Sequence, residues 1–226
     1  IDSRTVEDRD VFFCIKGEMN DGHQYISQAL EKGASAVVAN PEIIPDALQK
    51  REFPKILVPD PNLALREWAS DVRKNFEGKV LAVTGSNGKT STKEMLFSIF
   101  SQKNNTLKTE GNLNNLIGLP MQIFNLEKEH KKAVFEIGMN RVGEIDRLSE
   151  IAIPQVGVIT NIGKAHLESL CTLESVRDAK GEMINHIIPG GTMVINKDDN
   201  FYNYFLKKAK IKRLKIISFS KEDKKA

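Results

Sequence analysis

The residues best suited to chemistry lie in one stretch, VLAVTGSNGKTSTKEML, which spans residues 80 to 96. Gly85 and Gly88 permit backbone angles that other residues resist, so consecutive amides can face one concavity. The helix expected after the turn adds free amides and the positive end of its dipole. Lys89 supplies a mobile positive charge, and Thr90 a hydroxyl that can bind Mg²⁺. The stretch therefore predicts a cradle for the phosphates of a nucleoside triphosphate, with ATP the expected one.

The spacing of this turn departs from the usual phosphate loop. That pattern places four residues between its first glycine and the Gly-Lys pair, whereas only Ser86 and Asn87 do so here. The alternative is a glycine-rich turn with an incidental Lys-Thr pair. A phosphate-loop GTPase is disfavoured, because NKDD at residues 196–199 lies in a predicted strand-end turn and is not interpreted as a guanine-recognition motif.

Two further apolar runs end in polar clusters, FEIGMN at residues 135–140 and TNIGKAHLE at residues 160–168. In parallel α/β sheets, ligands collect at the carboxyl ends of the strands. Glu136 ends an apolar strand just before Gly138, and we expect it to bind Mg²⁺. The alternative for this carboxylate is a helix cap or a surface ion pair.

The elements that must position these residues alternate between strand and helix from residue 79 onward. The apolar runs predict strands at 79–84, 133–137, 155–160, 192–196 and 214–219. Helical spacing predicts helices at 90–103, 141–151, 173–187 and 200–209. This alternation predicts an α/β fold, with a largely parallel, doubly wound sheet covered by helices on both faces.

The first 77 residues predict a smaller α/β domain. Its strands are expected at 10–15, 34–39 and 55–60, and HQYISQALEKG has helical spacing that stops at Gly33. An amphipathic helix is expected to start at the cap Asn62. Because the pattern restarts near Gly78, we predict two domains, residues 1–77 and residues 78–226.

Composition excludes several classes of protein. Of 33 basic and 30 acidic residues, nine basic and two acidic ones lie in residues 207–226, which leaves 24 against 28 in the rest. No basic face with interleaved aromatics is apparent, so we expect no nucleic-acid partner, and no apolar run is long enough for membrane insertion. Cys14 and Cys171 fit no metal or redox spacing, which favours a cytosolic protein with Cys14 buried in packing. Since the chain starts at Ile1 and stops in a lysine-rich segment, we expect a piece of a longer protein.

The loop TGSNGKTST resembles that of the Mur ligase family, which includes folylpolyglutamate synthase and cyanophycin synthetase. Further segments resemble the MurF branch: DSRTV, FFCIKGEMNDGHQYISQALEKGASAVV, GNLNNLIGLP, FEIGMNRVGEIDRLSEIAIP, VITNIGKAHLESL, AKGEM and VINKDD. The resemblance covers nearly the whole chain. It departs at Arg9, where the family often has glycine in a Pro-Gly-Asp turn. Family members are also longer, with the rest of the ATP-binding domain and a third, Rossmann-like domain.

The resemblance implies an ATP-dependent amide ligase of peptidoglycan synthesis, and hence of cell-wall biogenesis, cell shape and cell division. Such an enzyme adds D-Ala-D-Ala to UDP-N-acetylmuramoyl-tripeptide through an acyl phosphate, with ATP and two Mg²⁺ ions. It implies a cytoplasmic enzyme that is a monomer at full length. The D-Ala-D-Ala site and some contacts to ATP, including those to its adenine, would lie outside this chain, so we expect the chain alone to be inactive.

The resemblance also implies roles for individual residues. Catalytic roles fall to Lys89, Lys180 and His166, and metal binding to Thr90, Glu136, His166 and Lys180. Lys180 is carbamylated in such enzymes, although its spacing alone predicts an ordinary helix-surface lysine. Nucleotide binding falls to Gly85, Ser86, Asn87, Gly88, Lys89, Thr90, Ser91, Asn112 and Asn115. Substrate binding falls to Ser3 and Arg4, for the UDP-sugar, and to Asn114.

Several alternatives stay open at this point. The asparagines of the GNLNN segment also suit a simple turn. His23 is equally compatible with a structural role and with a substrate contact. The protein as a whole is alternatively another amino-acid-adding ligase of the same family, or a non-catalytic nucleotide-binding remnant.

Overall fold

The structure is a computed structural model of the 226-residue chain, and it describes residues 1–17, 19–163 and 172–222. The chain divides into two compact units, residues 1–68 and residues 69–226, and each is described by itself. Within the described part of the chain, no helix has the length and apolar character needed to cross a membrane.

The division between the units lies inside a helix, α3 (Pro61–Lys74), upstream of the predicted boundary at residue 78. The ring of Trp68 packs on Phe13 of the first unit, with ring centroids 5.6 Å apart. The next residue, Ala69, belongs to the core of the second unit. The last residue of the first unit and the first residue of the second are therefore neighbours within one helix. The restart of the sequence pattern near Gly78 did not predict this.

The start of α3 differs from the prediction. The cap is Asp60, whose carboxylate accepts hydrogen bonds from the amides of Asn62 (2.8 Å) and Leu63 (3.1 Å). Pro61 takes the first helical position, where its missing N–H costs nothing. The expectation that Asn62 caps this helix is wrong, because the helix already includes it.

The first unit contains a three-stranded parallel sheet in the order β1-β2-β3. Its elements are β1 (Val11–Phe13), η1 (Gly22–Tyr25), α1 (Ile26–Glu31), β2 (Ala36–Ala39), α2 (Asp46–Gln49) and β3 (Lys55–Leu57). The three predicted strands are confirmed in shortened form, whereas the one-turn α2 was not predicted. Cys14 is fully buried in this unit's core, as expected, and burial raises the pKa of its thiol to about 12.

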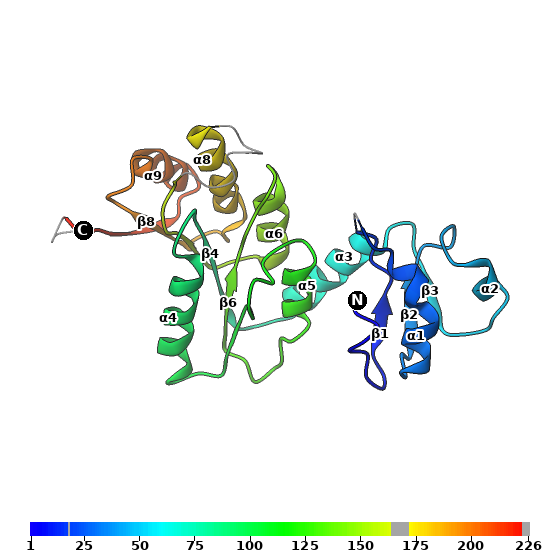
Figure 1. The fold of residues 1–226 in the computed structure, drawn as a ribbon. Helices are drawn as coiled ribbons and strands as arrows, with labels where there is room; N and C mark the ends of the chain where they lie inside the picture. Colours follow the sequence, from blue (N-terminus) through cyan, green and yellow to red (C-terminus); the bar gives the residue numbers. More distant parts are fainter. Residues whose placement is uncertain (18, 164–171, 223–226) are drawn as a thin grey trace. The chain divides into compact units, whose positions relative to one another are not determined.

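The second unit contains a six-stranded sheet, parallel throughout, in the order β5-β6-β4-β7-β8-β9 (Figure 1). Its strands are β4 (Lys79–Thr84), β5 (Thr106–Lys108), β6 (Lys132–Glu136), β7 (Val156–Ile159), β8 (Thr192–Asn196) and β9 (Lys215–Phe219). Its described helices are α4 (Lys89–Ser101), α5 (Gly118–Ile123), α6 (Glu144–Ala152), α8 (Leu173–Gly181), η2 (Glu182–His186) and α9 (Tyr202–Ile211). All five predicted strands are confirmed; β5 and α5 were not predicted.

Helices lie on both faces of this sheet, which confirms the doubly wound α/β prediction. On one face, Val83, Val134 and Val158 form a small cluster with side chains of α4. Residues of α5, α6, α8 and α9 pack against the other face in the larger core. In Figure 1, α4 lies on one side of β4 and β6, and α5 and α6 lie on the opposite side.

The strand order brings the first residues of the three predicted polar clusters to the same edge of the sheet. β4 is flanked by β6 and β7, and all three strands run in the same direction. The segments that leave these strands, after Thr84, Glu136 and Ile159, therefore meet at one edge of the sheet.

Candidate functional site

The turn after β4 has the backbone shape that its glycines allow. Gly85 has φ +149° and Gly88 has φ +77°. A side chain at Gly85 has no room, because an added Cβ would lie 1.9 Å from Thr160 Oγ1. Gly88 instead faces open space and begins α4, whose first amides have no partner within the helix. The turn is thus closed against β7 at one end and open at the start of α4.

The segment after β7 fixes this turn through several hydrogen bonds. The Ser86 amide donates to the carbonyl of Asn161 (2.9 Å), and the Asn87 amide donates to Asn161 Oδ1 (3.1 Å). Thr160 Oγ1 donates to the carbonyl of Asn87 at 2.6 Å. The Gly163 amide donates to Ser86 Oγ at 2.9 Å. Of the predicted donors, the amides of Ser86 and Asn87 are therefore engaged within the protein, and those at the start of α4 are better placed for an anion.

Lys89 folds back over the turn. Its Nζ donates to the carbonyl of Gly85 (2.8 Å) and to that of Ser86 (3.3 Å). Burial lowers the pKa of Lys89 from its ordinary value, and the negative charge of Glu136 partly offsets this effect. The side chain is half-buried, so its charge lies over the turn and within reach of an incoming anion.

Glu136 joins three segments at the end of β6, and only 3% of it is exposed. Its Oε2 accepts a hydrogen bond from Thr90 Oγ1, and its Oε1 accepts one from Asn114 Nδ2, both at 2.8 Å. Its own amide donates to Thr109 Oγ1 at 3.0 Å. The structure therefore brings together Glu136 and Thr90, the two predicted magnesium ligands that it describes at the turn.

The three asparagines of the GNLNN segment have different roles. Asn114 contacts Glu136, as described above. Asn115 Oδ1 accepts hydrogen bonds from the amides of Ile117 (3.1 Å) and Gly118 (2.8 Å), which caps α5. Asn112 is exposed, and its carbonyl accepts a bond from the amide of Asn114. Asn115 thus has the local structural role that the alternative interpretation gave to this segment.

Lys180, near the end of α8, is completely buried, contrary to the surface position that its spacing predicted. Its Nζ has no hydrogen-bond partner among the residues that the structure describes. The pKa of Lys180 is lowered to about 7, mainly by burial and to a smaller extent by the charge of Lys89. A large fraction of this amine is therefore neutral near pH 7. The neutral form is a nucleophile, because its nitrogen has a free electron pair.

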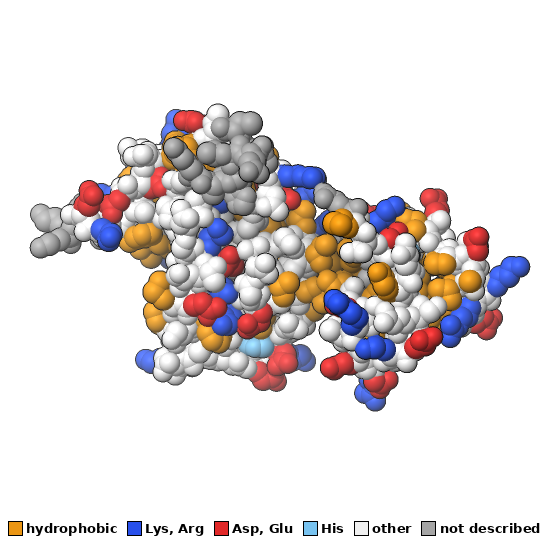
Figure 2. Space-filling view, viewed as in Figure 1, with side chains coloured by type: hydrophobic (Ala, Val, Ile, Leu, Met, Phe, Trp, Pro, Cys, Tyr) orange, Lys and Arg blue, Asp and Glu red, His pale blue; other side chains and the backbone are white. Residues whose placement is uncertain are grey.

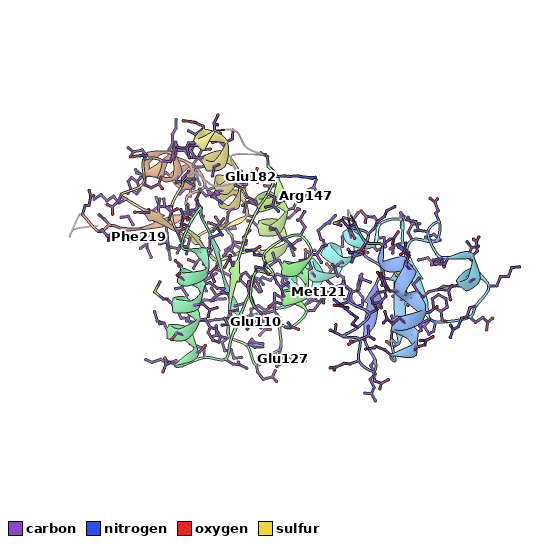
Figure 3. The ribbon with its side chains drawn as sticks, viewed as in Figure 1. Glu110, Met121, Glu127, Arg147, Glu182 and Phe219 are labelled. Atoms are coloured by element: carbon purple, nitrogen blue, oxygen red, sulfur yellow. The ribbon has the colours of Figure 1, made fainter. Side chains whose placement is uncertain are left out.

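The helix that follows Lys180 is tied to α6. Glu182, labelled in Figure 3, accepts hydrogen bonds from the amides of Gly143 (3.1 Å) and Asp146 (3.0 Å) at the start of α6. α6 begins at a glycine and has no cap of its own, so Glu182 supplies one from a distant part of the chain. Burial raises the pKa of Glu182, and the bonds from the two amides oppose that effect. Glu182, two residues after Lys180, is therefore held in place by hydrogen bonds to the start of α6.

The other predicted ligand, His166, lies outside the described residues. Among the residues that are described, no three His, Cys, Asp or Glu side chains gather at one point. The oxygen donors that can be placed are the Thr90 hydroxyl and the Glu136 carboxylate. Both are hard ligands of the kind that Mg²⁺ prefers, and a magnesium ion bound through few protein groups keeps several waters.

The residues predicted to contact the UDP-sugar lie in the first unit. Ser3 is buried, and its Oγ donates to Gln28 Oε1 at 2.6 Å. Arg4 is exposed and forms a two-point pair with Asp2, which holds the pKa of that carboxyl well below its usual range. His23 is buried; Nδ1 pairs with Asp21 at 2.6 Å and Nε2 accepts a bond from the Asn40 amide. With both ring nitrogens engaged, His23 has the structural role.

Comparison with known proteins decides the family. A model of the Mur ligase middle domain matches residues 83–226, and a model of the catalytic domain of the Mur ligase family matches residues 1–73. The chain belongs to the Mur ligase family.

Two curated relatives of this Mur ligase chain share one name. It is 38% identical to the UDP-N-acetylmuramoyl-tripeptide–D-alanyl-D-alanine ligase of Buchnera aphidicola, over 100% of this chain and 48% of that protein. For the Escherichia coli ligase of the same name, identity is 39% over 88% of this chain and 43% of that protein. The chain therefore spans about half the length of the curated relatives it matches.

Solved structures agree with the sequence relatives. A MurF crystal structure from Acinetobacter baumannii superposes with a TM-score of 0.89 at 40% identity, covering 96% of this chain and 47% of that one. A MurF from Thermotoga maritima in complex with ADP gives a TM-score of 0.84 at 35% identity, covering 98% of this chain and 50% of that one.

Sequence reasoning missed several residues that shape the site of this Mur ligase chain. Thr160 and Asn161 fix the turn, and the polar cluster at the end of β7 was the available signal for them. Thr109 follows a strand that was not predicted, so nothing indicated that it would hold Glu136. Lys93 is buried beside Thr109 although it lies among polar residues in the sequence.

Proposed function

We propose that the chain is the UDP-substrate-binding and phosphate-binding part of an enzyme that joins D-Ala-D-Ala to UDP-N-acetylmuramoyl-tripeptide at the expense of ATP. The observation that carries the proposal is the pairing of Thr90 with Glu136 beside Lys89, at the open end of the glycine turn. Relatives of this name match the chain from end to end, and the ADP complex of the Thermotoga maritima protein supports a nucleotide at this turn.

In this proposal Lys89 and the first amides of α4 bind the terminal phosphates. Thr90 and Glu136 hold a magnesium ion, which when bound neutralises phosphate charge. The carboxylate of the tripeptide attacks the γ-phosphate, and the bond to the leaving ADP breaks, giving an acyl phosphate. The amine of D-Ala-D-Ala then attacks the acyl carbon and phosphate leaves. Lys89 offsets the repulsion between two anions in the first step.

Lys180 fits a second function, as a carbamate. Its neutral amine attacks the carbon of CO₂, an N–C bond forms, and one proton leaves to solvent. The product is an anionic oxygen donor, suited to a second magnesium ion together with His166. The buried Nζ has no hydrogen-bond partner among the described residues, and its pKa is near 7. Both observations support this chemistry, because an ordinary ammonium has no free electron pair for CO₂.

The amine-binding part of the site is proposed to lie outside this chain, because the chain spans about half of its relatives. Correct placement of the attacking amine can supply ~7–11 kcal/mol of the barrier. The chain alone is therefore expected to bind substrates without completing the ligation.

The same proposal makes the full-length enzyme a cytoplasmic monomer that acts on small molecules. On the face shown in Figure 2, basic and acidic side chains are interspersed and form no single basic patch.

The proposal is tested by calorimetric titration of ADP with Mg²⁺ into the chain and its Lys89→Met variant. We expect Lys89→Met to weaken binding at least tenfold with the fold unchanged by circular dichroism. Lys212→Met is the matched control, because Lys212 is exposed at the end of α9. Equal ADP affinity of the parent and Lys89→Met would refute the phosphate assignment.

The amine and the acceptor are tested on the full-length polypeptide that contains this chain. It should form product from UDP-N-acetylmuramoyl-tripeptide and D-Ala-D-Ala, and release phosphate only when the tripeptide carboxylate is present. A preference for a single amino acid over D-Ala-D-Ala would point to another ligase of the family. Binding of nucleotide without any phosphate release would point to a non-catalytic protein.

A further inference from the structure

Helix α4 has one fully buried side chain, and it is a lysine. Lys93 is 1% exposed, whereas Leu96 and Phe100, which pack on the sheet, are only partly buried. Burying an ammonium costs free energy unless hydrogen bonds and charge compensate it. Lys93 Nζ donates to the carbonyl of Thr109 at 2.7 Å and lies 3.0 Å from Glu94 Oε1. An apolar side chain would cover the sheet at a lower cost in desolvation free energy. The presence of a lysine at this position is therefore best explained by its hydrogen bond to Thr109.

Thr109 connects Lys93 to the candidate metal ligand. It lies directly after β5 and is completely buried. Its amide donates to the carbonyl of Val134 at 3.1 Å, and its Oγ1 accepts a bond from the amide of Glu136 at 3.0 Å. Lys93 therefore fixes the residue that fixes the backbone of Glu136. Thr90, one turn earlier on α4, binds the side chain of the same glutamate.

We propose that Lys93 is a positioning residue for the metal site, which acts through Thr109 to keep the Glu136 carboxylate in register with the Thr90 hydroxyl. This inference rests on the proposed function, because it takes Glu136 and Thr90 as magnesium ligands. The segment beyond Thr109 is held from α5 as well. The amide of Glu110, labelled in Figure 3, donates to Gln122 Oε1 at 3.1 Å.

A purely structural explanation would be that Lys93 stabilises the fold through its ion pair with Glu94. The structure offers a matched control for that explanation. Lys108, on β5, lies 2.7 Å from the other oxygen of Glu94, and 18% of its side chain is exposed. Lys108→Met removes a cation from the same glutamate and leaves the bond between Lys93 and Thr109 intact.

The test is Mn²⁺ binding in the presence of saturating ADP, followed by electron paramagnetic resonance, on the parent protein, four single variants and one double variant. Loss of a group that orients a metal ligand typically weakens metal binding 10–100-fold. We expect a loss of that size, ~10-fold or more, for Lys93→Met and for Thr109→Val. Thr109→Ser, which keeps the hydroxyl, and Lys108→Met should bind within about twofold of the parent. The double variant Lys93→Met/Thr109→Val should be little weaker than the worse single variant, because both act on one chain of contacts.

Urea unfolding of each variant separates loss of fold from loss of metal affinity. If Lys93→Met does not fold, the comparison of Thr109→Val with Thr109→Ser decides, because valine removes the hydroxyl with little change of shape. Parent-like Mn²⁺ affinity in both Lys93→Met and Thr109→Val would overturn this inference and leave the proposed function standing. A parent protein that binds no Mn²⁺ with ADP would instead overturn the proposed function, and this inference with it.

Discussion

Thr90, in the first turn of α4, donates a 2.8 Å hydrogen bond to Oε2 of Glu136, at the carboxyl end of β6. The two residues are 46 positions apart, and the contact exists because β6 lies beside β4 in the sheet. It places a neutral oxygen and a carboxylate oxygen next to the glycine turn. A magnesium ion bound to both residues would break this hydrogen bond, and the two oxygens would become ligands of the metal.

The first prediction concerns this pair. Thr90→Val removes one oxygen and leaves Glu136 without that donor, so we expect Mg²⁺-dependent ADP affinity to fall ~10–100-fold. Thr90→Ser keeps the oxygen and should retain most of the affinity. Calorimetry with and without Mg²⁺ measures both, and Ser98→Ala, on an exposed part of α4, is the control. The metal assignment fails if Thr90→Val responds to Mg²⁺ as the parent does.

The second prediction concerns pH. Lys180 has a pKa of about 7 in the folded chain and an ordinary value of 10.5 when unfolded, because burial disfavours its charge. Between these values the unfolded state binds more protons, so stability should rise with pH from about 7 to about 10.5, by at most ~1.4 kcal/mol per pH unit. Below pH 7 the amine is charged in both states and this gain is absent.

Urea unfolding in CO₂-free buffer tests that dependence. The difference in unfolding free energy between the parent and Lys180→Met should increase in favour of the parent as pH rises above 7. Lys212→Met should follow the parent. With ¹³C-labelled bicarbonate, the parent should also gain a carbamate resonance above pH 7 that Lys180→Met lacks. A flat stability difference together with no such resonance would contradict the neutral-amine assignment.

The third prediction concerns the turn itself. Gly85→Ala would place a Cβ 1.9 Å from Thr160 Oγ1, so β7 or the turn must shift. We expect the free energy of unfolding to fall by ~3 kcal/mol or more, as for overpacking combined with backbone strain. Gly88→Ala meets no atom and should cost only ~1–2 kcal/mol for its left-handed backbone. Equal losses for the two variants, measured by urea unfolding, would show that the contact with Thr160 is unimportant.

The fourth prediction concerns Arg9, a non-glycine residue with a positive φ. Arg9 has φ +74°, a left-handed conformation that a side chain disfavours, and its side chain is largely exposed. Arg9→Gly should raise the unfolding free energy by ~0.5–1 kcal/mol, since relief of strain exceeds the entropy gained by the unfolded chain. Arg66→Gly, in the middle of α3, should instead lower it by ~1 kcal/mol. Destabilisation by Arg9→Gly would mean that its side chain makes a contact worth more than the strain.

Five strands of the second unit were predictable because each of them is an apolar run. β5 and α5 were not. β5 is only three residues long, with the sequence TLK, so it offers no alternation to detect. α5 is short and buried nearly all round, including Gln122, so it lacks the amphipathic spacing that identifies a surface helix.

The site was predictable residue by residue but not as a geometry. Glu136 and Thr90 were each expected to bind metal, yet only the strand order puts their oxygens together. For Lys180 the predicted environment was wrong, because helical spacing predicted an exposed lysine and the packing of α8 buries it. The burial of Lys93 could not be predicted either, since the carbonyl that accepts its hydrogen bond belongs to Thr109, which follows the undetected β5.

The placement of α3 across both units has a consequence for cutting the chain. Proteases bind extended backbone, and the junction at Trp68 and Ala69 is helical, so limited proteolysis has no linker to attack there. An expression boundary at residue 78 would leave Ala69, Val72 and Arg73 behind. Arg73 is buried, and its guanidinium donates to the carbonyls of Ala152 (2.6 Å) and Ile153 (2.8 Å) where α6 ends. A separately produced second unit must therefore begin at or before Ala69 to retain these side chains, and at or before Asp60 to retain the whole of α3 with its cap.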